Sequence, residues 1–279
     1  MSAVSLALVA CLGWGIADFL GGFKSRALPV ITVLLVSTSC GLAAMAAIAL
    51  NRGVVLQFGA HLGYAAAGGI AGLVGLICLY RGMAIGAMSI VAPISALGVL
   101  LPVTFGLVAG DLPSPWQTLG MVAALAGAVL VSREKRTLEP SPKKIADGVL
   151  LAAGAALAIG IFYVVMDRAS DIDPLGASLV MRLTQFALLI PLVLVSRPCL
   201  RVGPGHWPFL IGMGVLDALA GLAYAIATAQ GMLSLVAVLG SLYPAVTVLL
   251  AILVLRERPQ RIQFAGVALA LAGVALITL

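Results

Sequence analysis

Long apolar stretches alternate with short polar segments along the whole chain. A helix that crosses the hydrocarbon core of a bilayer needs roughly 20 mostly apolar residues. Ten stretches approach or exceed this length, at residues 3–23, 29–50, 59–80, 85–109, 115–132, 146–167, 174–196, 206–228, 231–255 and 262–279. Because apolar residues run unbroken here, the stretches are typical of helices and not of outer-membrane strands, in which apolar and polar residues alternate. The pattern predicts an all-α, polytopic membrane protein with ten transmembrane helices.

The overall composition agrees with this class. Hydrophobic residues make up 62% of the chain and charged residues only 9%. Soluble globular domains carry about 25% charged residues, so this chain cannot cover a soluble surface with polar groups. Disordered chains have the opposite composition. The first apolar stretch is too long for the core of a signal peptide and has no basic segment before it, so we expect a retained helix.

Basic residues concentrate in alternate connections between the predicted helices. These connections hold Lys24, Arg26, Arg81, Arg133, Lys135, Arg136, Lys143, Lys144, Arg197, Arg201, Arg256, Arg258 and Arg261. The other connections hold only Arg52 and Arg168. The positive-inside rule therefore places the basic connections in the cytoplasm and both termini outside, in a protein of the cytoplasmic (inner) membrane. The net charge of +6 then reflects topology, and no nucleic-acid partner is expected.

A shift of about 145 residues superimposes the sequence on itself. The matched pairs include Gly15 and Gly160, Pro29 and Pro174, His61 and His206, Ser89 and Ser234, and, with one inserted residue, Gln117 and Gln263. We expect a first repeat at 1–132, a cytoplasmic linker at 133–145 and a second repeat at 146–279, with five helices in each repeat. Because five is odd, the repeats are inverted in the membrane. Inverted repeats are the usual construction of secondary transporters, which bind substrate near the midplane and work by alternating access.

The second repeat also carries a characteristic motif. Residues 235–247 read LVAVLGSLYPAVT, and Glu257, Gln263 and Gly266 follow. This region resembles the EamA domain of the drug/metabolite transporter (DMT) superfamily. The first half is similar but weaker, since Asp111 stands where the family has Glu. The resemblance implies ten helices in two repeats and transport of small metabolites, often export. Eukaryotic relatives usually place both termini in the cytosol, whereas the charges here favour the opposite orientation.

Three ionisable residues fall inside predicted helices: Asp217, Arg182 and Asp18. Such a residue at a helix centre costs about 2.5–3.5 kcal/mol on insertion scales and usually faces a cavity. None is matched by a like residue in the other repeat, so we expect all three to bind substrate or a coupling proton. Two structural alternatives stay open. Asp217 and Arg182 could simply neutralise each other, and Asp18 could pair with Lys24 or Arg26 near the interface.

Aromatic and polar residues at helical spacing extend this candidate site. Residues three, four and seven positions apart share a helix face. The expected cavity-lining residues are Trp14, Tyr163, Gln185, Tyr224 and Tyr243. The alternative for the aromatic residues is packing, or anchoring at the membrane interface. Pro93 and Pro244 interrupt main-chain hydrogen bonds inside the fourth and ninth predicted helices, so we expect them to act in gating.

These features predict a secondary transporter that moves a small polar metabolite, with export the favoured direction. One acid and one base in a cavity suit a zwitterion such as an amino acid. The alternatives are a passive channel or a non-transport membrane subunit. The sequence leaves the oligomeric state open. An intramembrane enzyme is disfavoured because neither HExxH nor GxSxG occurs. The four cysteines lie far apart without a CxxC motif, so neither a zinc site nor a disulfide framework is indicated. No metal and no cofactor are expected.

Overall fold

A computed structural model describes residues 1–54, 56, 59–85, 91, 94–95, 97–131, 142–255 and 261–278 of the chain. Its helices are α1 (Ala3–Lys24), α2 (Val30–Asn51), α3 (Ala60–Ile85), η1 (Leu97–Val99), α5 (Leu100–Ala109), α6 (Pro115–Val131), α7 (Pro142–Ser170), α8 (Pro174–Ser196), η2 (Pro204–His206), α9 (Trp207–Thr228), α10 (Leu233–Gly240), α11 (Tyr243–Leu255) and α12 (Arg261–Ile277). No strand occurs among these described residues, which agrees with the all-α class predicted from the apolar pattern.

In the described part of the chain, six helical segments are long and apolar enough to cross a bilayer: Ala3–Lys24, Val30–Asn51, Ala60–Ile85, Asp147–Ser170, Pro174–Ser196 and Pro204–Thr228. Shorter apolar helices in the described residues overlap the other four predicted stretches, at Leu97–Ala109, Pro115–Leu130, Leu233–Thr247 and Arg261–Ile277. The chain is therefore a multi-pass membrane protein. Helix α7 begins at Pro142, inside the expected linker at 133–145, and the linker residues before it lie outside the described part.

The ninth predicted helix is not continuous. Helix α10 ends at Gly240 and α11 begins at Tyr243. Pro244 has no backbone N–H and so cannot donate to the carbonyl of Gly240, which removes one helical hydrogen bond at this point. All eight residues of α10 are buried, so the break lies in the protein interior. The fourth predicted helix is represented by η1 and α5, and Pro93 lies outside the described residues.

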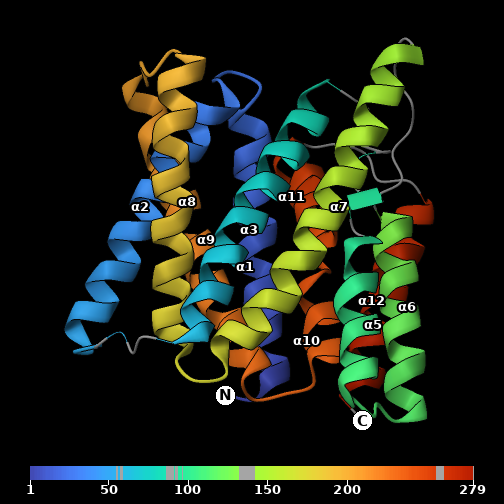
Figure 1. Ribbon diagram of the computed structural model, residues 1–279. Coiled ribbons are helices and arrows are strands. Elements are labelled where there is room, and N and C mark those ends of the chain that lie inside the picture. Colours follow the sequence, from blue (N-terminus) through green and yellow to red (C-terminus); the bar gives the residue numbers. More distant parts are fainter. Residues whose placement is uncertain are drawn as a thin grey trace.

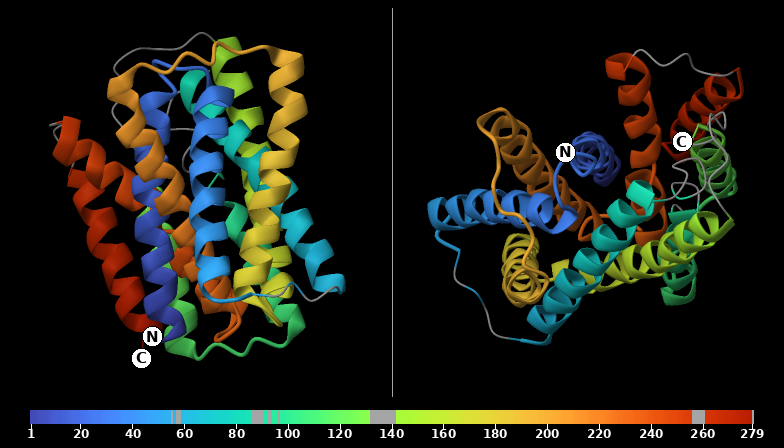
Figure 2. Two further views of the ribbon diagram at one scale, coloured as in Figure 1. Left: turned by 90° about the vertical axis from the view of Figure 1, so that its left-hand side faces the viewer. Right: turned by 90° about the horizontal axis from the view of Figure 1, so that it is seen from above.

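Both termini lie at the same end of the helical bundle, shown at the bottom of Figure 1. Helix α1 runs away from this end, and α7, which opens the second half, runs toward it. Seen from above in Figure 2, α2 and α8 lie on one side of the bundle and α6 and α12 on the opposite side. The two halves of the chain thus run through the bundle in opposite directions.

Helix contacts occur in corresponding pairs across the two halves. Helix α1 packs against α9, and α7 packs against α3. In the same way α2 contacts both α9 and α8, while α8 contacts α3. Helix α6 packs along α12. Exchanging each helix of the first half for its counterpart in the second half reproduces this set of contacts, as expected for two units related by an approximate two-fold axis.

Glycines at the repeat spacing create these close contacts. A Cβ atom at Gly214 of α9 would collide with the backbone oxygen of Ser37 in α2. At Gly69, the counterpart of Gly214 in α3, a Cβ atom would lie 2.6 Å from the backbone oxygen of Met181 in α8. Likewise, a Cβ atom at Gly127 would lie 2.7 Å from the backbone oxygen of Gly266. Small residues let membrane helices approach this closely because lipid supplies no hydrophobic drive between them.

Candidate functional site

A cavity lies at the centre of the bundle and is lined by helices from both halves of the chain. It offers about 60 Å³ to the centres of water-sized molecules, which is room for a few waters. The helices α1, α3, α7, α8, α9 and α11 contribute its lining residues, which are Trp14, Asp18, Gly72, Leu76, Leu79, Ile159, Phe162, Tyr163, Met181, Arg182, Gln185, Asp217, Gly221 and Tyr243. Most of this surface is apolar, with a few polar groups, which is typical of small-molecule sites.

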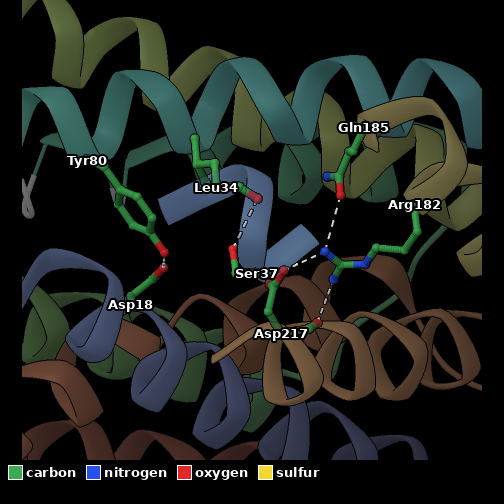
Figure 3. A network of polar contacts seen from close by, with 7 residues as sticks. All are labelled: Asp18, Leu34, Ser37, Tyr80, Arg182, Gln185 and Asp217. Carbon is green, nitrogen blue, oxygen red and sulfur yellow. Dashed lines mark hydrogen bonds and ion pairs between the residues drawn. The ribbon is translucent and has the colours of Figure 1, made fainter. Parts of the chain in front are cut away.

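An ion pair between α8 and α9 faces this cavity (Figure 3). Arg182 donates from Nη1 to Asp217 Oδ2 at 2.5 Å and from Nη2 to the backbone oxygen of Asp217 at 2.7 Å. Nη1 also donates to Gln185 Oε1 at 3.2 Å. The Arg182 side chain is 3% exposed and that of Asp217 20% exposed. The guanidinium therefore sits inside the protein while the carboxylate keeps contact with the cavity.

Arg182 has an unused donor at Nε. Its Nε atom is buried and has no hydrogen-bond partner. A guanidinium carries five N–H donors and can bind carboxylates with two of them. The corresponding residue of the first half, Ser37, instead donates to Leu34 of its own helix at 3.3 Å, and Gly72 occupies the position that corresponds to Asp217. The cross-helix pair is thus a feature of the second half.

A second carboxyl group faces the cavity from α1. Tyr80 of α3 donates from its hydroxyl to Asp18 Oδ1 at 2.9 Å, and both side chains are buried (Figure 3). No Lys or Arg among the described residues forms an ion pair with Asp18. Lys24 lies instead over the ring of Phe209, with Nζ 3.8 Å from the ring centroid. A pair of Asp18 with Lys24 or Arg26, the alternative left open by the sequence, is not among the ion pairs of the described residues.

Four aromatic rings pack together below the ion pair, on the side of the termini. They belong to Trp14, Phe162, Tyr163 and Tyr224, and the centroids of Tyr163 and Tyr224 are 4.9 Å apart. Tyr224 is fully buried, donates to the backbone oxygen of Tyr163 at 3.4 Å, and is not among the residues that line the cavity. Trp14 precedes Asp18 on α1 and Tyr224 follows Asp217 on α9, so this aromatic cluster separates the ion pair from the terminal end.

Tyr243 and Pro244 lie at the start of α11, where the broken helix turns beside α1. Tyr243 lines the cavity and is buried. One turn later, the Thr247 hydroxyl donates to the backbone oxygen of Gly15 at 3.0 Å. The break between α10 and α11 is therefore joined to the cavity wall formed by α1.

Several residues of the site were not among the sequence candidates. Tyr80, Phe162 and Met181 contribute to the site but resemble ordinary apolar or interfacial residues in sequence. The repeat could have pointed to Gly72 as a site residue, since its position corresponds to that of Asp217. A Cβ atom at Gly72 would lie 2.9 Å from Gln185 Nε2, so a larger residue would intrude on the polar group there. In the described part of the chain, no three His, Cys, Asp or Glu side chains gather in an arrangement able to hold a metal ion.

Comparisons with known proteins identify the family. One solved crystal structure superimposes with a TM-score of 0.84 at 21% sequence identity, covering 99% of this chain and 98% of the other, and so shares the fold. A comparison with curated protein sequences found no match. The model of the EamA-like transporter family matches residues 1–133 and again residues 146–279. Since these two matches span nearly the whole chain, the protein belongs to the EamA-like transporter family of the DMT superfamily.

Proposed function

We propose that the protein is a secondary transporter that moves a small polar metabolite across the cytoplasmic membrane. In this proposal, ten membrane crossings form two inverted repeats at 1–132 and 146–279, joined by a cytoplasmic linker at 133–145. The substrate binds in the central cavity, and the repeats rock to open that cavity to one side at a time, as in other inverted-repeat transporters. Export is the favoured direction. The other reading of the family and site, a passive channel, predicts flux without saturation.

The Arg182–Asp217 pair inside a cavity lined by both halves is the observation that carries this proposal. A buried pair is a costly way to gain stability, because desolvation offsets most of the attraction. A substrate carboxylate can bind the guanidinium of Arg182, which lines the cavity, and a substrate amine can bind Asp217, which is partly exposed. Trp14, Tyr163 and Tyr243 would contact the apolar part of such a zwitterion, with Gln185 orienting Arg182 and Tyr224 supporting the aromatic rings from behind.

Gating is assigned to the interrupted helices. The break between Gly240 and Tyr243 lets α10 and α11 tilt separately, and Pro244 keeps the helical hydrogen bond from reforming. Pro93 is proposed to have the same role in the fourth crossing. The aromatic cluster would close the cavity toward the terminal end in this state.

A stability screen followed by a flux assay tests the proposed function. A metabolite that binds the folded transporter should raise its unfolding temperature, and the same metabolite should then show saturable uptake into proteoliposomes. Asp217→Asn should abolish saturable uptake, since it removes the charge that binds the substrate. Asp171→Asn, which changes an exposed carboxylate in the turn before α8, is the matched control and should transport normally. Full activity of Asp217→Asn would exclude Asp217 from the mechanism, and unsaturable flux would indicate a channel.

The proposed orientation has its own test in a native cysteine. Cys199 is exposed and lies in the α8–α9 connection. This connection is at the end of the bundle opposite the termini (Figure 1). With the other cysteines replaced, we expect a membrane-impermeant maleimide to leave Cys199 unlabelled in intact cells and to label it after lysis. Leu112→Cys, at an 87% exposed position in the α5–α6 connection, should be labelled in intact cells. The reverse labelling pattern would place both termini in the cytoplasm.

A further inference from the structure

Two carboxyl groups face the central cavity, and their environments differ. Asp217 lies against the guanidinium of Arg182, which neutralises it. Asp18 is 9% exposed and receives one hydrogen bond, from the neutral hydroxyl of Tyr80 at 2.9 Å. Figure 3 shows the Asp18–Tyr80 pair and the Arg182–Asp217 pair as two separate contacts in the same polar region.

The contact with Tyr80 satisfies only part of the Asp18 carboxyl group. An ionised carboxylate has about four acceptor positions on its two oxygens, and the Tyr80 hydroxyl fills one on Oδ1. A buried charge without an opposite charge is strongly disfavoured, and such a group usually becomes neutral by binding a proton. Since Asp18 lines the cavity, water there can deliver a proton to its second oxygen.

The other charged and titratable groups around Asp18 also leave it without an opposite charge, unlike Asp217. Helix α3 presents Tyr80, and α7 and α11 present Tyr163 and Tyr243, all neutral hydroxyl groups. Helix α9 presents the Asp217 carboxylate and α8 presents Arg182, whose charge is already matched by Asp217. On α1 itself, Lys24 lies over Phe209. The charge of Arg182 is thus matched by Asp217, that of Lys24 lies against an aromatic ring, and no Lys or Arg among the described residues forms an ion pair that would hold Asp18 as a carboxylate.

We propose that Asp18 is the proton-binding carboxyl group of this transporter and that Tyr80 is its positioning residue. This assignment rests on the proposed transport function. Proton binding can be coupled to substrate movement only if the cavity opens to one side of the membrane and then to the other. Water on one side gives a proton to Asp18 Oδ2 and forms the neutral acid. After the cavity reopens, the acid returns that proton to water on the other side, and the carboxylate is restored. Asp217 takes no part in this proton transfer and pairs with Arg182 or with a substrate cation.

Infrared spectroscopy of the full-length protein in lipid nanodiscs tests the proton site without any substrate. The difference spectrum between acidic and alkaline pH should contain the C=O band of a protonated carboxyl group. This band should lose one component in Asp18→Asn and keep that component in Asp171→Asn, the matched control, which removes an exposed carboxyl group in the turn before α8. In Tyr80→Phe the component should remain but move to higher frequency, because its hydrogen bond is lost. If Asp18→Asn does not fold, this shift in Tyr80→Phe is the decisive measurement.

Three results would overturn the proposal. The first is an unchanged carboxyl band in Asp18→Asn together with no shift in Tyr80→Phe. The second is loss of the component in Asp217→Asn instead. The third uses Trp14, one turn before Asp18, as the single fluorescent tryptophan after Trp116 and Trp207 are replaced by Phe. Emission that responds to sodium at constant pH, and not to pH, would make Asp18 a metal-cation site.

The two proposals fail separately in these experiments. Absence of saturable flux in proteoliposomes would remove the transport function while the infrared component could still be assigned to Asp18. Loss of the Asp18 assignment, with saturable flux intact, would leave a transporter whose coupling group lies elsewhere.

Discussion

Replacing Arg182 by methionine is expected to destabilise the protein by about 3–5 kcal/mol, because it leaves Asp217 without its opposite charge inside the bundle. Arg182 supplies both the guanidinium contact to Asp217 Oδ2 and the second contact to its backbone oxygen. Replacing both residues, as Arg182→Met with Asp217→Leu, should recover most of this loss, since apolar residues of similar size often substitute for a buried pair without cost. Unfolding in mixed detergent micelles measures all the variants.

Transport separates the two roles of this pair. If the pair only neutralises two charges, the double variant should be both stable and active. If it binds substrate, the double variant should be stable and inactive. We expect the second result, because one donor of Arg182 is buried without a partner and Asp217 is exposed to the cavity. A stable double variant with normal saturable uptake would reduce the pair to a structural contact.

The second large effect is expected at Gly214. A Cβ atom there would collide with the backbone oxygen of Ser37, and a backbone atom cannot rotate away. Gly214→Ala should therefore force α9 and α2 apart and destabilise the protein by about 1–3 kcal/mol, the usual cost of overpacking. Gly212→Ala lies two residues earlier on the same helix, where a Cβ atom meets nothing within 4 Å. That control should be neutral or stabilising by up to about 1 kcal/mol, because alanine favours helix more than glycine does.

Thermal unfolding of the purified variants in one detergent compares Gly214→Ala with Gly212→Ala directly. A third substitution tests the repeat, because Gly69 makes the corresponding contact with Met181 in the other half of the chain. Gly69→Ala should therefore destabilise in the same direction as Gly214→Ala. Equal unfolding temperatures for the Gly214 and Gly212 variants would mean that α2 and α9 can separate without loss, contrary to the packing described above.

The three intramembrane ionisable residues have different surroundings, and this shapes how each can act. Arg182 and Asp217 hold α8 and α9 together in the second half, whereas Ser37 and Gly72 leave the corresponding helices of the first half without such a contact. Asp18 contacts α3 through a neutral hydroxyl. A scaffold of two similar halves thus carries its polar groups unevenly, which is how a symmetric frame can acquire a substrate site and a separate proton site.

Much of the architecture could be predicted from the sequence because hydropathy and repeat spacing are properties of continuous segments. Summed over about 20 residues, apolar character indicates a membrane helix whatever it packs against. The 145-residue spacing predicted related halves, and the family match covers both of them. The sequence likewise singled out Asp18, Arg182 and Asp217, because a charge inside an apolar stretch is conspicuous without any knowledge of its neighbours.

Only the tertiary structure decided which side chains meet. Arg182 and Asp217 lie 35 residues apart, and Asp18 and Tyr80 lie 62 apart, so their contacts depend on how each helix is rotated and where it crosses its neighbour. Helical spacing placed Tyr224 on a candidate face, yet the packing of four rings places it behind the cavity. How each helix is rotated and where it crosses its neighbour depend on small residues such as Gly214 and Gly69. These residues let a particular neighbouring helix approach closely. A linear pattern records that such residues are small and does not record what they touch.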